Sequence, residues 1–157
     1  MKIQLAQAAD AAAICLVQRR SWQHVYDHQL IENMLQALPV SLHQRLWMQR
    51  IASTDCSTWT VNTPLVSGLL MLEQVDQELE LAALYLDPDA IGQGWGRLLF
   101  EHACREVKSK ALYCWVMEDN HHAQGFYQHL GFEFSDERRE FNFCGSHFIQ
   151  KKAQLVR

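Results

Sequence analysis

Apolar residues recur every three to four positions in two segments near the start of the chain, residues 10–28 and 31–38. This spacing predicts two amphipathic helices. Pro39 ends the second of them, because proline cannot donate the backbone hydrogen bond that a continuing helix needs. Ser41, with Gln44 three residues later, forms a capping box, which predicts that a third helix begins there.

After residue 55 the pattern changes to short runs of β-branched and other apolar residues bounded by turn residues, which is typical of strands. The expected strands after residue 55 are residues 58–61, 65–73 and 78–86, and the expected turns between them are residues 62–64 and 75–77. A short edge strand is also expected at the N-terminus, over residues 2–5.

The second half of the chain alternates helices and strands. Residues 112–117 are almost entirely apolar, which is typical of a strand buried on both faces with a parallel neighbour. The expected helices are residues 94–108 and 120–130, and the other expected strands are residues 132–134, 141–143 and 148–152. This order of elements predicts an α/β layered fold, and the length of 157 residues predicts that residues 1–157 form a single domain.

Composition narrows the function classes. The chain carries 14 Lys and Arg against 18 Asp and Glu, a net charge of −4, so the overall basic character of a nucleic-acid-binding domain is absent. Five scattered cysteines without a Cys-x-x-Cys pair fit free thiols in a reducing compartment. The chain turns polar too soon for a signal peptide, and no apolar run reaches the ~20 residues that span a bilayer. We therefore expect a cytoplasmic protein with neither a nucleic-acid nor a membrane partner.

Gly92, Gly94 and Gly96 alternate in a short loop between an expected strand and an expected helix. Glycine lets the backbone approach a ligand closely and adopt positive φ angles. The free N–H groups at the start of the helix, together with its dipole, attract negative charge. The loop is therefore expected to bind an anion.

Two common nucleotide-binding motifs do not account for this loop. A Walker loop would end in Gly-Lys-Ser or Gly-Lys-Thr, whereas this loop ends in Gly96-Arg97-Leu98. The dinucleotide fingerprint needs a third glycine where Arg97 stands, although Asp119 could imitate its ribose-binding acid. Too little chain follows to complete a second nucleotide-binding half, so dinucleotide binding is the weaker alternative.

Two further motifs flank the glycine loop. Leu84-Tyr85-Leu86-Asp87-Pro88 precedes it, and the pattern N-x-x-A-x-x-F-Y-x-x-x-G-F begins at Asn120. With the loop, these motifs resemble the GCN5-related N-acetyltransferases, most strongly over residues 78–134. The resemblance implies a central mixed, mostly antiparallel sheet with helices on both faces and two strands that splay apart around an acyl-coenzyme A site. It also implies direct transfer of an acetyl group from acetyl-coenzyme A to a primary amine.

The resemblance also implies how acetyl-coenzyme A binds. The pyrophosphate would lie on the backbone N–H groups of the glycine loop, and the pantetheine arm would pair with the strand that ends at Leu86. Arg97 would add a charge-assisted contact, whereas Asn120 would either contact the cofactor arm or only cap its helix. Ile91 stands where the family usually has Arg or Gln. The expected cofactor-binding residues are Leu84, Tyr85, Leu86, Ile91, Gly92, Gln93, Gly94, Trp95, Gly96, Arg97, Asn120, Ala123, Phe126 and Tyr127.

Direct transfer needs a neutral amine and a proton for the departing thiolate. Tyr127 matches the tyrosine that donates this proton in the family, and a phenol with an ordinary pKa of about 10 suits the role; the alternative is core packing. Glu80 is the expected general base, directly or through water. Glu78, two residues earlier on the same strand face, is the second candidate, and either carboxylate could instead lie on a solvated face.

The early helices and late strands wall the acceptor site in relatives. Here this points to Trp22 and Tyr26, together with Glu78, as substrate-binding residues, and to Trp47, His24 and His28 as further candidates; the aromatic residues could equally belong to the core. An aromatic-walled pocket would suit a small amine, and an open groove a peptide amine.

The sequence also allows alternative activities and an alternative oligomeric state. A non-catalytic acyl-coenzyme A-binding module and an acyltransferase for a longer acyl group are the alternatives to an acetyltransferase, and a homodimer is an open alternative to a monomer. His121, His122 and His129 do not converge on one point at helical spacing, so no metal is expected. Cys114 lies in a buried strand pattern, which favours packing over a nucleophilic role.

Overall fold

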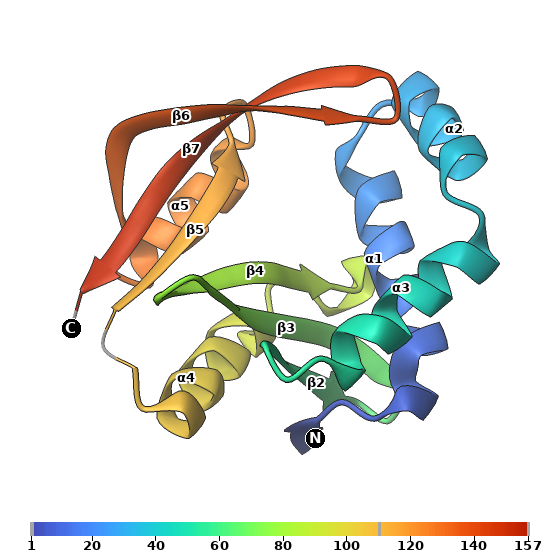
Figure 1. Cartoon of the computed structure of the whole chain (residues 1–157). Coiled ribbons are helices and arrows are strands. Elements are labelled where there is room, and N and C mark those ends of the chain that lie inside the picture. Colours follow the sequence, from blue (N-terminus) through green and yellow to red (C-terminus); the bar gives the residue numbers. More distant parts are fainter. Residues whose placement is uncertain (1, 110, 157) are drawn as a thin grey trace.

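The computed structural model describes residues 2–109 and 111–156, and within them seven strands form one sheet in the order β1-β2-β3-β4-β5-β7-β6 (Figure 1). Neighbouring strands are antiparallel except β4 and β5, which are parallel. The strands are β1 Lys2–Leu5, β2 Cys56–Asn62, β3 Val66–Val75, β4 Glu78–Leu86, β5 Ala111–Met117, β6 Glu133–Phe143 and β7 Ser146–Val156. The expected mixed, mostly antiparallel sheet is confirmed.

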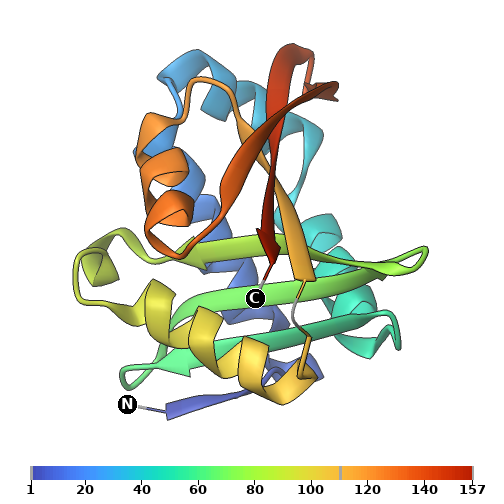
Figure 2. The same cartoon turned by 90° about the vertical axis from the view of Figure 1, so that its left-hand side faces the viewer.

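Helices cover both faces of the sheet, as Figures 1 and 2 show, because β3 is apolar on both sides. Leu69 and Met71 pack with α1 and α3, whereas Leu70 and Leu72 pack with α4 on the other face. The helices are α1 Ala11–Val25, α2 His28–Ala37, α3 Val40–Ala52, α4 Trp95–Val107 and α5 His121–His129. No helix in the described part of the chain is both long and apolar enough to cross a membrane.

Two details of the expected elements are wrong. The third helix begins at Val40, one residue before Ser41, and Pro39 occupies its N-cap position with an extended backbone, so Ser41 lies inside the first turn and forms no cap. The expected strands 132–134 and 141–143 are one continuous strand, β6. Its polar middle stays in the sheet because β7 supplies backbone partners, and an irregularity between Phe134 and Arg138 absorbs the change of register.

The parallel strands β4 and β5 are joined where they begin and separate afterwards. The structure pairs Glu80 with Tyr113, and beyond this point β4 follows β3 while β5 follows β7 (Figure 1). Among the described residues, no strand pairs with the β5-facing edge of β4 beyond Glu80. The sheet therefore opens into a V whose exposed edge is the second half of β4.

The β6–β7 hairpin crosses the molecule and ends on the helices of the opposite side (Figure 1). Phe143, Cys144 and Phe148 near its turn pack against a small core formed by α2. Leu30, Ile31 and Met34 are the buried members of that core. The hairpin thus bridges the two halves of the split sheet.

Candidate active site

The glycine loop leads from the end of β4 into α4. Gly92 and Gly94 have φ angles of +84° and +86°, which favour glycine, and a Cβ atom at either position would meet open space. The Leu98 amide donates to the Gly94 carbonyl over 3.2 Å, which is the first hydrogen bond of α4. The amides of residues 95–97 precede it and have no acceptor within the helix, so they are placed to bind an anion.

Gly96 has a different role from the other two loop glycines. A Cβ atom there would lie 3.1 Å from the Phe126 ring, so the missing side chain lets α4 pack closely against α5. Arg97 also joins these helices: its Nη1 lies 3.4 Å from the Glu101 carboxylate, and its Nη2 donates to the His129 carbonyl over 3.2 Å. The guanidinium expected to contact phosphate is therefore held by protein partners.

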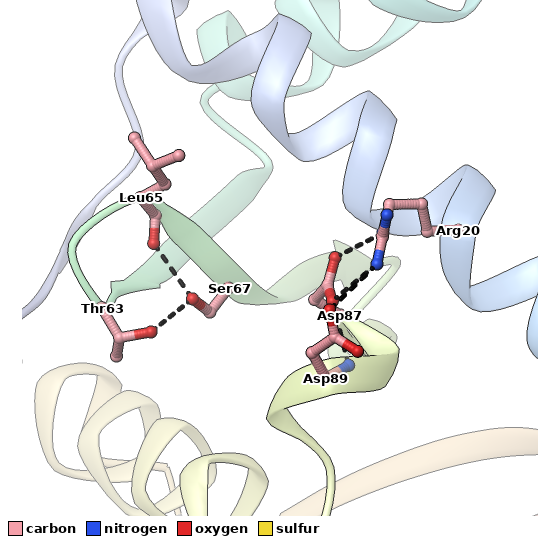
Figure 3. A network of polar contacts seen from close by, with 6 residues as sticks. All are labelled: Arg20, Thr63, Leu65, Ser67, Asp87 and Asp89. Carbon is pink, nitrogen blue, oxygen red and sulfur yellow. Dashed lines mark hydrogen bonds and ion pairs between the residues drawn. The ribbon is translucent and has the colours of Figure 1, made fainter.

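Arg20 of α1 holds the chain between β4 and the glycine loop in place (Figure 3). Its Nε donates to Asp87 Oδ2 over 2.7 Å, and its Nη2 lies 3.3 Å from both Asp87 Oδ1 and Asp89 Oδ2. Asp87 also accepts the Asp89 amide, which caps the short 3₁₀ helix Pro88–Ala90. The sequence reasoning missed Arg20, because 67 residues separate it from Asp87.

We expect Arg20→Ala to lower the free energy of unfolding by about 1 kcal/mol, because the loop loses its bidentate anchor. We also expect it to raise roughly 5-fold the KM for acetyl-coenzyme A, the co-substrate that the motif resemblance implies. Chemical denaturation and initial-rate kinetics measure the two effects. Arg45→Ala removes an equally charged, exposed side chain from α3 and is the matched control. Equal KM values for the two variants would show that the anchor does not position the loop.

Tyr127 lies on α5, where its ring packs edge-on against Phe126 and Phe132 at centroid distances of 5.5 Å. Burial raises the pKa of the Tyr127 phenol well above its ordinary value, and the Cys114 thiol and Tyr85 phenol add to the shift. These neighbours belong to β5 and β4, so the phenol lies near both arms of the V. It keeps its proton at neutral pH, as a general acid must.

Asn120 caps the helix that carries this tyrosine. Its side chain accepts the Ala123 amide over 3.1 Å, which is the helix-capping alternative that the sequence left open. The cap fixes where α5 begins, and with it the side of the V on which Tyr127 lies.

Glu80 stands at the point where the V closes. Tyr113 donates a hydrogen bond to its Oε2 over 3.5 Å. Burial raises the pKa of the Glu80 carboxyl above its ordinary value of 4.5; the Arg139 guanidinium opposes this rise, and the Glu73 carboxylate adds to it. A half-buried carboxylate of raised pKa is a suitable proton acceptor.

Glu78 does not share this environment. It is exposed, lies 4.0 Å from the Lys152 ammonium, and lines a separate cavity of about 560 Å³ near the start of β4. It does not line the cavity that contains Glu80. The structure therefore separates the two carboxylates that the sequence offered as bases.

A cavity of about 530 Å³ lies between the N-terminal helices, β3 and β4, and the β6–β7 hairpin. Trp22 and Tyr26, which the sequence offered as acceptor-binding residues, line it. Trp47 is fully buried in the core, where its indole donates to Gln18. His24 and His28, the remaining candidates, are exposed and do not line the cavity. Sequence reasoning missed most of the other lining residues, among them Glu73, Arg139, Phe141, Phe143 and Phe148.

A buried polar network supports the Trp22 wall. The Trp22 ring stacks on His43 at a centroid distance of 5.2 Å and an angle of 5°. Arginine only donates, so the Arg19 guanidinium donates to His43 Nδ1 over 3.2 Å, and His43 Nε2 donates to the Gln18 oxygen over 2.7 Å. Burial, with Arg19 and Arg50, lowers the pKa of His43 to about 4, so its ring is neutral at physiological pH.

The other candidate chemistries find no support in the described residues. Among them, no group of three or more His, Cys, Asp or Glu side chains could hold a metal ion. Cys114 is 1% exposed, and burial raises the pKa of its thiol to about 12, so it is not a thiolate at neutral pH.

Similar folds occur in solved N-acetyltransferase structures. The PaiA N-acetyltransferase of Thermoplasma acidophilum, in complex with coenzyme A, is 20% identical with a TM-score of 0.75, and the match covers 100% of both chains. The ribosomal-protein-S18-alanine N-acetyltransferase of Escherichia coli is 19% identical with a TM-score of 0.72, over 99% of this chain and 92% of that one.

Sequence comparison adds two matches. A peptidyl-lysine N-acetyltransferase, YjaB of Salmonella typhimurium, is 45% identical over 51 residues, which are 32% of this chain; the match spans about a third of that relative (34%). The model of the acetyltransferase (GNAT) family matches residues 18–132, which hold the glycine loop, Glu80 and Tyr127. This match confirms the resemblance seen in the motifs: the chain belongs to the acetyltransferase (GNAT) family.

Proposed function

We propose that this acetyltransferase moves the acetyl group of acetyl-coenzyme A to a primary amine by direct attack. One observation carries the proposal: the opening between β4 and β5 has a loop of positive-φ glycines and a helix N-terminus at one end, a protonated tyrosine near both of its arms and a half-buried carboxylate where it closes. These three features suit acetyl transfer from acetyl-coenzyme A to an amine: an anchor for the diphosphate of the donor, an acid for the leaving thiolate and a base for the amine.

Each group in the opening between β4 and β5 has a separate role in binding or in proton transfer. The amides at the start of α4 bind the pyrophosphate, and the open edge of β4 at residues 84–86 pairs with the pantetheine arm. A backbone N–H near Leu86 polarises the thioester carbonyl. The amine nitrogen forms a bond to the carbonyl carbon and the carbon–sulfur bond breaks. Tyr127 gives its proton to the leaving sulfur, and Glu80 takes the proton from the amine, directly or through water.

Thiol release from acetyl-coenzyme A, measured across a panel of amines, tests this function. We expect amine-dependent release together with the acetylated amine by mass spectrometry. Calorimetric binding of acetyl-coenzyme A without release by any amine would support the non-catalytic module instead. Faster release from a longer acyl-coenzyme A with the same amine would identify the longer-chain acyltransferase.

Glu80→Gln is expected to lower kcat/KM about 10²-fold at neutral pH, because the amide cannot accept the amine proton. The ionised fraction of Glu80 falls as the pH falls through its pKa. Because burial raises this pKa above 4.5, the wild-type rate declines on acidification at a higher pH than an ordinary glutamate would give. The variant should lack this acidic limb in its pH–rate profile.

Glu78→Gln is the matched control for this experiment, since Glu78 is exposed and lies two residues away on β4. Its pH–rate profile should match that of the wild type. The opposite result, in which Glu78→Gln loses the acidic limb and Glu80→Gln keeps it, would assign the base to Glu78.

A further inference from the structure

The β6–β7 hairpin lines one side of the cavity that contains Glu80 and reaches α2 (Figure 1). Near the turn, Phe143 and Phe148 pack against the small core of α2, beside Trp22 and Tyr26. These packed side chains leave no room for an extended peptide to lie along this side of the cavity. The hairpin therefore favours an acceptor that fits within the cavity.

The walls of the cavity are aromatic and fixed in position. Phe143 contacts Trp22 at a centroid distance of 5.8 Å, and Phe148 contacts Tyr26 at 6.2 Å. Trp22 is also stacked on the neutral ring of His43, which is itself held by two hydrogen bonds. Preorganised rings of this kind bind a flat apolar group with little loss of side-chain entropy.

The floor of the cavity is polar. Glu73 and Glu80 are cross-strand partners on β3 and β4, and both line the cavity next to the opening of the V. Arg50 and Arg139 also line it, with their guanidinium groups 4.9 Å and 4.4 Å from the rings of Trp47 and Trp115. The two arginines balance the two carboxylates, so the floor suits one amine and gives no excess negative charge for a polycation.

From these observations, and resting on the proposed acetyl transfer, we infer that the acceptor is a small monoamine that carries an aromatic group. Its nitrogen would lie near Glu80, and its ring would lie among the aromatic side chains under the hairpin. The cavity volume of about 530 Å³ is within the range of small-ligand sites, roughly 300–1,000 Å³.

Four acceptors at equal concentration test this inference by thiol release: 2-phenylethylamine, ethylamine, a linear polyamine and a lysine-containing peptide. We expect kcat/KM for 2-phenylethylamine to exceed that for ethylamine by about 10- to 100-fold, which is the effect of burying one aromatic ring. The polyamine and the peptide should be poorer acceptors than 2-phenylethylamine.

Variants connect the preference to the cavity. Ala82 lines the cavity from β4, and Ala82→Leu fills part of it without removing any packing side chain. We expect this variant to lose the preference for 2-phenylethylamine over ethylamine, measured as the ratio of the two kcat/KM values. Trp22→Ala should reduce the same preference by removing a wall. Asn142→Ala alters an exposed residue between Phe141 and Phe143 on β6 and is the control.

The outcomes separate this inference from the function on which it rests. Efficient acetylation of the peptide or the polyamine, with no preference for the aromatic amine, would overturn the inference and leave the acetyltransferase intact. An aromatic preference that survives unchanged in both Ala82→Leu and Trp22→Ala would also overturn it. Failure to release thiol with every acceptor would contradict the proposed function itself.

Discussion

Tyr127→Phe is expected to lower the single-turnover rate of acetyl transfer by about 10²–10⁴-fold, with little change in the affinity for acetyl-coenzyme A. The ring contacts with Phe126 and Phe132 survive the substitution, and only the proton donor is lost. Because burial holds the pKa of Tyr127 well above its ordinary value, the wild-type phenol is protonated throughout the neutral range. Rapid-quench measurement with excess enzyme isolates this step from product release.

Two measurements make the Tyr127 result interpretable. Calorimetry with acetyl-coenzyme A should give the same dissociation constant for the variant and the wild type, which shows that the site is intact. Equal single-turnover rates for the two proteins would contradict the acid role, and Tyr127 would then be a packing residue of α5.

Gly94→Glu is expected to weaken acetyl-coenzyme A binding by at least about 100-fold, because a carboxylate would face the bound pyrophosphate. The site has open space for a side chain, so the fold should survive, although a φ of +86° costs a non-glycine residue roughly 1–2 kcal/mol. Calorimetry measures the binding, and circular dichroism confirms the fold. Gly96→Glu would be a poorer probe, because its side chain would collide with the Phe126 ring.

The chain offers two matched controls for this substitution. Gly145→Glu places the same side chain at a φ of +79° in the β6–β7 turn, also with open space, so it carries the same strain and charge elsewhere. Gly94→Ala introduces the strain without the charge. Normal binding by Gly94→Glu would show that the loop does not hold the pyrophosphate.

The sequence predicted most of the fold because most of its signals are local. The expected strand at residues 78–86 matches β4, and the helix at residues 94–108 matches α4 to within one residue at each end. One error arose where tertiary contacts decide: β6 runs through a polar segment because β7 pairs with it. The other error is local, since Pro39 and not Ser41 occupies the N-cap position of α3.

Some features of the candidate site could also be predicted from local sequence, and others depend on tertiary packing. The glycine loop and the cap at Asn120 could be recognised because positive φ angles and capping depend on neighbouring residues. The contacts of Arg97 and the anchor from Arg20 could not be recognised, because a long side chain reaches partners that only the packing of helices brings near. Gly96 combines a local signal with a tertiary contact. The glycine motif identified it as a loop residue, and only the structure shows that its missing side chain makes room for the Phe126 ring.

By itself, the sequence determined most of the order of elements, the glycine loop, the family motifs, the tyrosine proposed as acid and two candidates for the base. Only the tertiary structure decided which of Glu80 and Glu78 faces the cavity under the β6–β7 hairpin, because the two differ in burial and not in type. It also decided the cavity itself, since Trp22, Glu73, Glu80 and Phe148 lie on α1, β3, β4 and β7. Local patterns carry no information on how such distant segments meet; their mutual packing sets the volume and the charge of this cavity.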